Sequence, residues 1–89
     1  MNILKAADDI VSNRTEEKAK QYGNFIDCMA KTARIASEMS GKEITTEDCY
    51  NVLIALKLAR QSNCHKEDNL LDACAYIGSL NNFKNKKNE

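Results

Sequence analysis

The sequence predicts an all-α protein, and three features of its composition and spacing support this class. The 89 residues include no proline and only three glycines, so few positions interrupt a helix. Two Phe, three Tyr and no Trp leave a core of mainly aliphatic side chains, which favour helices. Apolar residues recur at intervals of three and four, which places them on one side of a helix. We expect one domain, residues 1–83, folded as a small antiparallel bundle of about four helices.

The first two helices are predicted from this spacing. The first covers residues 2–12 and the second, a long helix, covers residues 16–40. Thr15 is a candidate N-cap of the second helix, and Gly41 is its C-terminal stop. The apolar stripe of the second helix needs a partner helix and comprises Tyr22, Phe25, Ile26, Met29, Ala30, Ala33, Ala36 and Met39.

The third predicted helix has the clearest start, because Thr45 can cap it and Asp48 follows three residues later. It continues to about Gln61 and is apolar over most of its circumference, which predicts a central position. The fourth helix covers residues 65–82, and short connections make the last three helices antiparallel neighbours. Residues 84–89 are predicted to be a disordered basic tail.

The charge balance and the lengths of the apolar runs disfavour nucleic acids and membranes as partners. Thirteen basic and thirteen acidic residues give a formal net charge of +0, whereas proteins that bind duplex DNA or RNA normally carry a basic excess. No apolar run approaches the roughly 20 residues of a membrane span, and no signal peptide is recognised. The four cysteines form no Cys-x-x-Cys pair, so we expect core thiols in a reducing cytoplasm. A homo-oligomer is expected, because so small a domain folds alone only marginally.

Arg60 is the residue that most directly suggests a function. At about 100° per residue it projects into the apolar arc of the third helix, near Leu53 and Leu56, with Lys57 at the edge of that arc. Fixed charge in such a place needs partners. Arg60 either extends its charge to solvent or to a carboxylate on a neighbouring helix, or forms with Lys57 a cationic floor for an anion such as phosphate. The sequence leaves both alternatives open.

Four polar side chains share one side of the fourth helix, since His65, Asp68, Asp72 and Tyr76 recur at spacings of three, four and four. They form either an ordinary solvated stripe or a polar groove whose carboxylates accept hydrogen bonds from the two cations of the third helix or from a ligand. Asp68 and Asp72 could also hold Mg²⁺, because carboxylate oxygens suit that ion.

A second unusual place is the pair Tyr22 and Gly23 inside the predicted second helix. A glycine there costs roughly 1 kcal/mol relative to alanine, so it calls for an explanation. The glycine either allows close approach of another helix or of a ligand beside Tyr22, or it produces a kink without function. Arg14, Lys18 and Lys20 precede this place and add positive charge.

These residues carry a family resemblance that covers the chain up to about residue 83. Their pattern, an Arg followed by Tyr-Gly, then Lys-x-x-Arg, then His-x-x-Asp-x-x-x-Asp-x-x-x-Tyr, resembles a family of small phage and prophage proteins with a domain of unknown function. The matching positions are Arg14, Tyr22, Gly23, Lys57, Arg60, His65, Asp68, Asp72 and Tyr76. The spacing between Arg14 and Tyr22 is longer here than in many relatives.

The acidic helical hairpin is also distantly similar to the all-helical nucleoside triphosphate pyrophosphohydrolases. Those enzymes hold Mg²⁺ between Glu-x-x-Glu on one helix and Glu-x-x-Asp on another. Asp68 and Asp72 approximate the second motif, and the first is missing. The resemblance therefore implies a protein that binds nucleotides without hydrolysing them.

Our leading hypothesis is a phage-type protein that sequesters a phosphate-bearing nucleotide or a cyclic-nucleotide-like molecule, such as a host antiviral defence signal, without turnover and without a cofactor. Lys57 and Arg60 would meet the phosphates. Tyr22 or Tyr76 would stack on the base, and the two aspartates of the fourth helix would accept hydrogen bonds from it or from the ribose. One alternative is a Mg²⁺-dependent pyrophosphohydrolase-like enzyme with Asp68 and Asp72 as metal ligands. Another is an interaction protein that inhibits a host factor through an apolar helix face.

Overall fold

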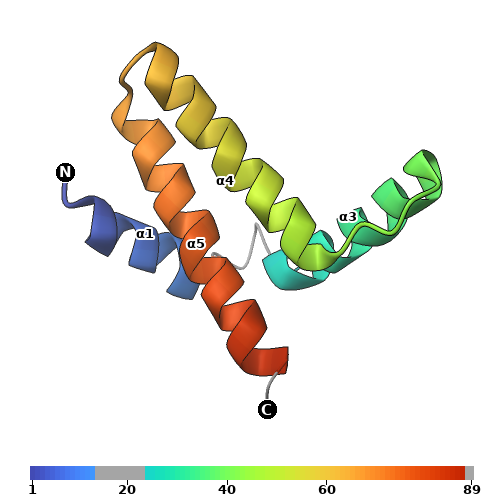
Figure 1. Ribbon diagram of the computed structural model, residues 1–89. Coiled ribbons are helices and arrows are strands. Elements are labelled where there is room, and N and C mark those ends of the chain that lie inside the picture. Colours follow the sequence, from blue (N-terminus) through green and yellow to red (C-terminus); the bar gives the residue numbers. More distant parts are fainter. Residues whose placement is uncertain (14–23, 88–89) are drawn as a thin grey trace.

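The computed structural model (Figure 1) describes residues 1–13 and 24–87. Within these ranges the chain forms four helices and no strand: α1 (Ile3–Ser12), α3 (Phe25–Ser40), α4 (Thr46–Asn63) and α5 (Glu67–Lys87). The helices pack against one another in a small bundle. The predicted all-α class is therefore confirmed.

The hairpin of α4 and α5 is the centre of the molecule. The two helices lie side by side and antiparallel, joined by the short connection 64–66, as predicted. Figure 1 shows that α1 lies across α5, whereas α3 leaves the start of α4 and projects away from the hairpin. This projection makes the chain less compact than a closed bundle. Its radius of gyration is 13.8 Å, compared with about 12 Å for a compact domain of this length.

The main apolar core lies where α3, α4 and α5 meet. Tyr50 of α4 is 0% exposed, and the ring of Phe25 of α3 packs edge-on against it with ring centroids 5.9 Å apart. Phe83 of α5 covers Tyr50 at a centroid distance of 6.2 Å. The buried members of this core are Met29, Ala33, Cys49 and Tyr50. Aromatic side chains contribute large apolar areas, so Tyr50 and its two ring neighbours hold α3 and α5 against α4.

Local hydrogen bonds explain where α3 ends and α4 begins, and both positions confirm the sequence prediction. Gly41 has a φ of 72°, in the left-handed region, and its N–H donates to the carbonyl of Ser37. Thr45 caps α4 in a capping box: its hydroxyl accepts from the Asp48 N–H at 3.0 Å, and the Asp48 carboxylate accepts from the Thr45 N–H at 3.0 Å.

The second helix, predicted over residues 16–40, is not continuous across residue 24. Among the described residues α3 begins at Phe25, because Asn24 adopts an extended conformation with φ −70° and ψ 134°. Its side-chain oxygen accepts from the backbone N–H groups of Ile26 at 2.9 Å and Asp27 at 3.3 Å, which makes Asn24 the N-cap. The proposed cap at Thr15 lies outside the described residues.

Both ends of the fourth helix differ from the prediction. α5 begins at Glu67 rather than His65, and it continues through Lys87 rather than ending near residue 82. No glycine or proline follows residue 82 to end the helix, and Phe83 packs on the core. The Lys84 ammonium also lies 2.7 Å from a carboxylate oxygen of Glu47. Residues 84–87, assigned from the sequence to a tail, therefore extend α5.

The sequence predicted a central position for α4 because the helix is apolar over most of its circumference. In the structure α4 is not enclosed by other helices on all sides. Its inner side packs on α3 and α5, but Val52 is 66% exposed and Leu58 is 49% exposed. Among the described helices, none is long and apolar enough to cross a membrane.

Candidate functional site

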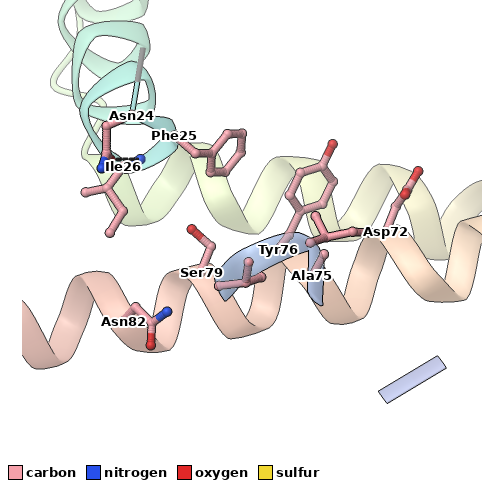
Figure 2. A pocket seen from close by; sticks show the side chains of 10 residues that line it. Asn24, Phe25, Ile26, Asp72, Ala75, Tyr76, Ser79 and Asn82 are labelled. Atoms are coloured by element: carbon pink, nitrogen blue, oxygen red, sulfur yellow. Dashed lines mark hydrogen bonds between the residues drawn. The ribbon is translucent and has the colours of Figure 1, made fainter. Parts of the chain in front are cut away.

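A cavity of about 310 Å³ lies between the end of α1, the start of α3 and the middle of α5 (Figure 2). Its apolar walls include Ile10, Val11, Phe25 and Ile26. Its polar groups include Asp72, Ser79 and Asn82 of α5 and Asn24, the N-cap of α3. Apolar walls with a few polar groups are the usual composition of a small-molecule site, and this volume is at the lower end of the usual range.

The aromatic side of the cavity is formed by Tyr76 and Phe25. Their rings are stacked, with centroids 5.9 Å apart and an angle of 18° between the planes. Tyr76 lies four residues after Asp72 and three before Ser79, so all three side chains line the cavity from consecutive turns of α5. Figure 2 shows Asp72 and Ser79 on either side of Tyr76 along the helix.

Ser79 also connects the cavity to the core. Its hydroxyl and the Tyr50 hydroxyl are 2.7 Å apart and share a buried hydrogen bond. Burial raises the pKa of the Tyr50 hydroxyl above its ordinary value, while the bond to Ser79 acts in the opposite direction. The hydrogen bond holds one wall of the cavity in a fixed position relative to α4.

Asp72, which lines the cavity, forms an ion pair with Lys57 of α4, which is not one of the lining residues. The Lys57 ammonium lies 2.9 Å from Asp72 Oδ2, and the two side chains are 17% and 38% exposed. A carboxylate of the fourth predicted helix therefore meets a cation of the third, which is one of the two alternatives that the sequence left open. The pair places a hydrogen-bond donor and an acceptor together beside the aromatic wall.

Arg60 lies elsewhere, and its side chain is exposed to solvent, which is one of the alternatives that the sequence left open. It lines an open cleft with Asn63, Lys66 and Asn69. No residue of this cleft lines the cavity at Asp72. Among the described helices, α5 lies beside the far half of α4 (Figure 1), and the side of α4 that carries Arg60 is exposed there. In the last turn of α4 the positive charge of Arg60 also interacts favourably with the helix dipole.

The remaining predicted residues are not brought to the cavity. The His65 ring nitrogen Nδ1 lies 2.6 Å from Gln61 Nε2, in the exposed connection before α5. Asp68 is exposed in the first turn of α5 and lines no wall of the cavity. Arg14, Tyr22 and Gly23 lie outside the described residues. Across residues 1–13 and 24–87, no group of three or more His, Cys, Asp or Glu side chains is arranged to hold a metal ion.

The cysteines differ from one another in exposure. Cys49 is buried in the core, where burial, and secondarily the negative charge of Asp48, raises the pKa of its thiol. Cys28 is exposed, so the expectation of a core thiol is wrong for this residue. Cys64 is also exposed, and the sequence places it in the connection between the last two helices. All four are free thiols.

Comparison with known families identifies the chain at the level of its domain. The family described as a domain of unknown function (DUF6378) matches residues 2–84. The chain belongs to this family. The DUF6378 match spans the four described helices up to the last turns of α5. No curated protein and no solved structure matches the chain.

Sequence reasoning missed several residues of the DUF6378 cavity. Phe25 was assigned to the apolar stripe of a longer helix, and Ser79 and Asn82 were not considered. A signal was available for Ser79, because it continues the spacing of Asp72 and Tyr76 by another turn. For Phe25 there was no comparable signal, since its place depends on where α3 begins.

Proposed function

We propose that this DUF6378 domain binds a nucleotide-like ligand in the cavity between α1, α3 and α5 and does not convert it. The observation that carries the proposal is that the stacked rings of Phe25 and Tyr76 line the same cavity as Asp72, whose carboxylate pairs with Lys57. An aromatic surface next to a paired cation and carboxylate has the groups that a planar base and its polar substituents require.

Each group has a defined role in the proposal. The base lies against the aromatic pair, a contact worth roughly 1–3 kcal/mol in proteins that stack nucleobases. Asp72 uses Oδ2 for Lys57, and no hydrogen bond or ion pair to its Oδ1 is found among the described residues. That oxygen is available to accept from an amino group of the base or from a ribose hydroxyl. The Lys57 ammonium carries three donors, of which Asp72 takes one, so a phosphate can take another.

The size of the cavity limits the ligand. A volume of about 310 Å³ suits a single nucleoside unit, because cavities for drug-sized ligands span roughly 300–1,000 Å³. A ligand with two nucleoside units would extend outside the described cavity. The sequestering role, including capture of a defence signal by a phage protein, is the finer part of the proposal and rests on the family resemblance and the incomplete carboxylate set.

The test is a panel of mononucleotides and cyclic nucleotides incubated with the protein and Mg²⁺, followed by chromatography before and after denaturation. Intact nucleotide released only on denaturation supports binding without turnover. Release of pyrophosphate or of another cleaved product contradicts the proposal and favours the enzyme. A panel in which no nucleotide is retained, and none shifts the melting temperature, also contradicts it.

A matched pair of substitutions locates the site. Asp72→Asn should weaken binding of the best ligand at least roughly tenfold, because a hydrogen bond to a charged group is lost. Asp68→Asn is the control, since it makes the same chemical change one turn earlier on α5, outside the cavity. Equal losses in both variants would place the ligand somewhere other than the cavity.

A further inference from the structure

The outer side of α4 carries a row of exposed side chains with an acidic residue at one end, two apolar residues in the middle and a basic residue at the other end. Asp48, Val52, Leu56 and Arg60 follow one another at intervals of four residues, and all four are exposed. We call these four residues the α4 ridge. Residues four apart form a continuous ridge on a helix surface, and ridges of this type pack together in the commonest class of helix contact.

The ridge is not covered within the described chain. α3 contacts α4 near its beginning and α5 follows its inner side, as Figure 1 shows. Val52 remains 66% exposed and Leu56 remains 41% exposed. Among the described residues Arg60 forms no ion pair, and the carboxylate of Asp48 is engaged only through Oδ2, with the Thr45 N–H.

The ridge is complementary to itself when two copies meet in antiparallel orientation. Residues equally far before and after Ile54 then lie opposite one another, so Val52 of each copy meets Leu56 of the other. The same register sets Arg60 of each copy opposite Asp48 of the other. Asp48 and Arg60 of one ridge are about 18 Å apart along the helix. Because the second copy has the same spacing in the opposite direction, an Arg60–Asp48 pair can form at each end of the contact.

The exposed area of the chain is large enough for this association. Its accessible surface is 6588 Å², whereas a compact monomer of 10.0 kDa exposes about 5,200 Å². The excess of roughly 1,300 Å² is spread over the whole chain, and a standard interface buries roughly 800 Å² per partner. The formal net charge of +0 adds no overall repulsion between copies.

We propose that the α4 ridge is the interface of a two-fold symmetric homodimer. Two hydrophobic contacts form its centre and two Arg60–Asp48 ion pairs close its ends. The ridge shares no residue with the cavity of the proposed function. The test of the dimer and the test of the nucleotide site can therefore have different outcomes.

Sedimentation velocity over a range of micromolar concentrations tests the dimer. The wild type should have twice the 10.0 kDa mass of one chain, and Val52→Glu should have the mass of one chain. Leu58→Glu is the control, because Leu58 is 49% exposed on the same helix and outside the ridge. A monomeric wild type overturns the proposal, even if the ridge binds a different protein. A dimer that survives Val52→Glu but not Leu58→Glu also overturns it.

Charge reversal tests the register. Arg60→Glu and Asp48→Arg should each raise the dissociation constant of the homodimer at least roughly tenfold, because like charges then meet at both ends. Mixed together, the two variants should form a heterodimer, since the two acidic side chains of one variant then face the two arginines of the other. Circular dichroism of each variant controls for the capping role of Asp48. Two folded variants that fail to associate on mixing overturn the proposed register.

Discussion

The buried hydrogen bond between Tyr50 and Ser79 offers the sharpest test of how the core supports the cavity. The two hydroxyl oxygens are 2.7 Å apart, with Tyr50 0% and Ser79 7% exposed. Tyr50→Phe keeps the ring in the core but leaves the Ser79 hydroxyl buried without its partner. This loss should destabilise the fold by about 1–3 kcal/mol, the cost of an unsatisfied buried polar group.

Ser79→Ala should cost a similar amount for the same reason, because it leaves the Tyr50 hydroxyl unpaired. The double variant leaves no unpaired group, so its cost should be clearly smaller than the sum of the single costs. We expect an interaction free energy of about 1–2 kcal/mol. A change of about 1 kcal/mol moves the melting temperature of a domain this size by about 4–8 °C, which thermal and urea melts resolve easily.

A control comes from the other tyrosine of the cavity. Tyr76 is only partly buried, and no hydrogen bond of its hydroxyl is found among the described residues, so Tyr76→Phe should change stability by less than about 0.5 kcal/mol. If the double variant loses as much stability as the two single variants added together, the reasoning is refuted. Such a result would mean that the Tyr50 and Ser79 hydroxyls do not stabilise each other.

Three further predictions concern the backbone and the titrating groups. Gly41→Ala should cost about 1–2 kcal/mol in urea melts, because φ is +72° there, whereas Gly78→Ala in α5 should stabilise by about 0.5–1 kcal/mol. The folded-state pKa values of Cys49 and Tyr50 are raised, so the unfolded chain loses these protons first. The contribution of these two groups to stability should therefore be fully present below about pH 8 and fall as pH rises beyond it, which alkaline melts can measure. Cys28 should react with a thiol reagent in the folded protein while Cys49 stays protected.

The parts of the fold that follow from local chemistry could be predicted from the sequence. The start of α4 depends on Thr45 and Asp48, which bond to each other's backbone within one turn. The end of α3 depends on Gly41 alone. The start of α3 could not be predicted, because the apolar spacing continues on both sides of residue 24. The sequence alone does not show whether Asn24 lies inside a helix or caps one.

The candidate site was predicted in part, for a related reason. Lys57 and Arg60 are three residues apart and look equivalent in the sequence. Their directions differ by about 60° around the helix, and the packing of α4 on α5 decides which one faces inward. Lys57 meets Asp72, whereas Arg60 faces solvent. That difference is set by contacts between helices, which no local pattern records.

The most direct test of the proposed site is to map backbone amide chemical shifts while the best nucleotide of the panel is added. The account predicts the largest changes at residues that line the cavity from three different helices, such as Ile10, Phe25 and Tyr76. The amides around Arg60 should change little, because they line a separate cleft. Changes concentrated around Arg60 and Lys66, with none at the three cavity residues, would contradict the central claim.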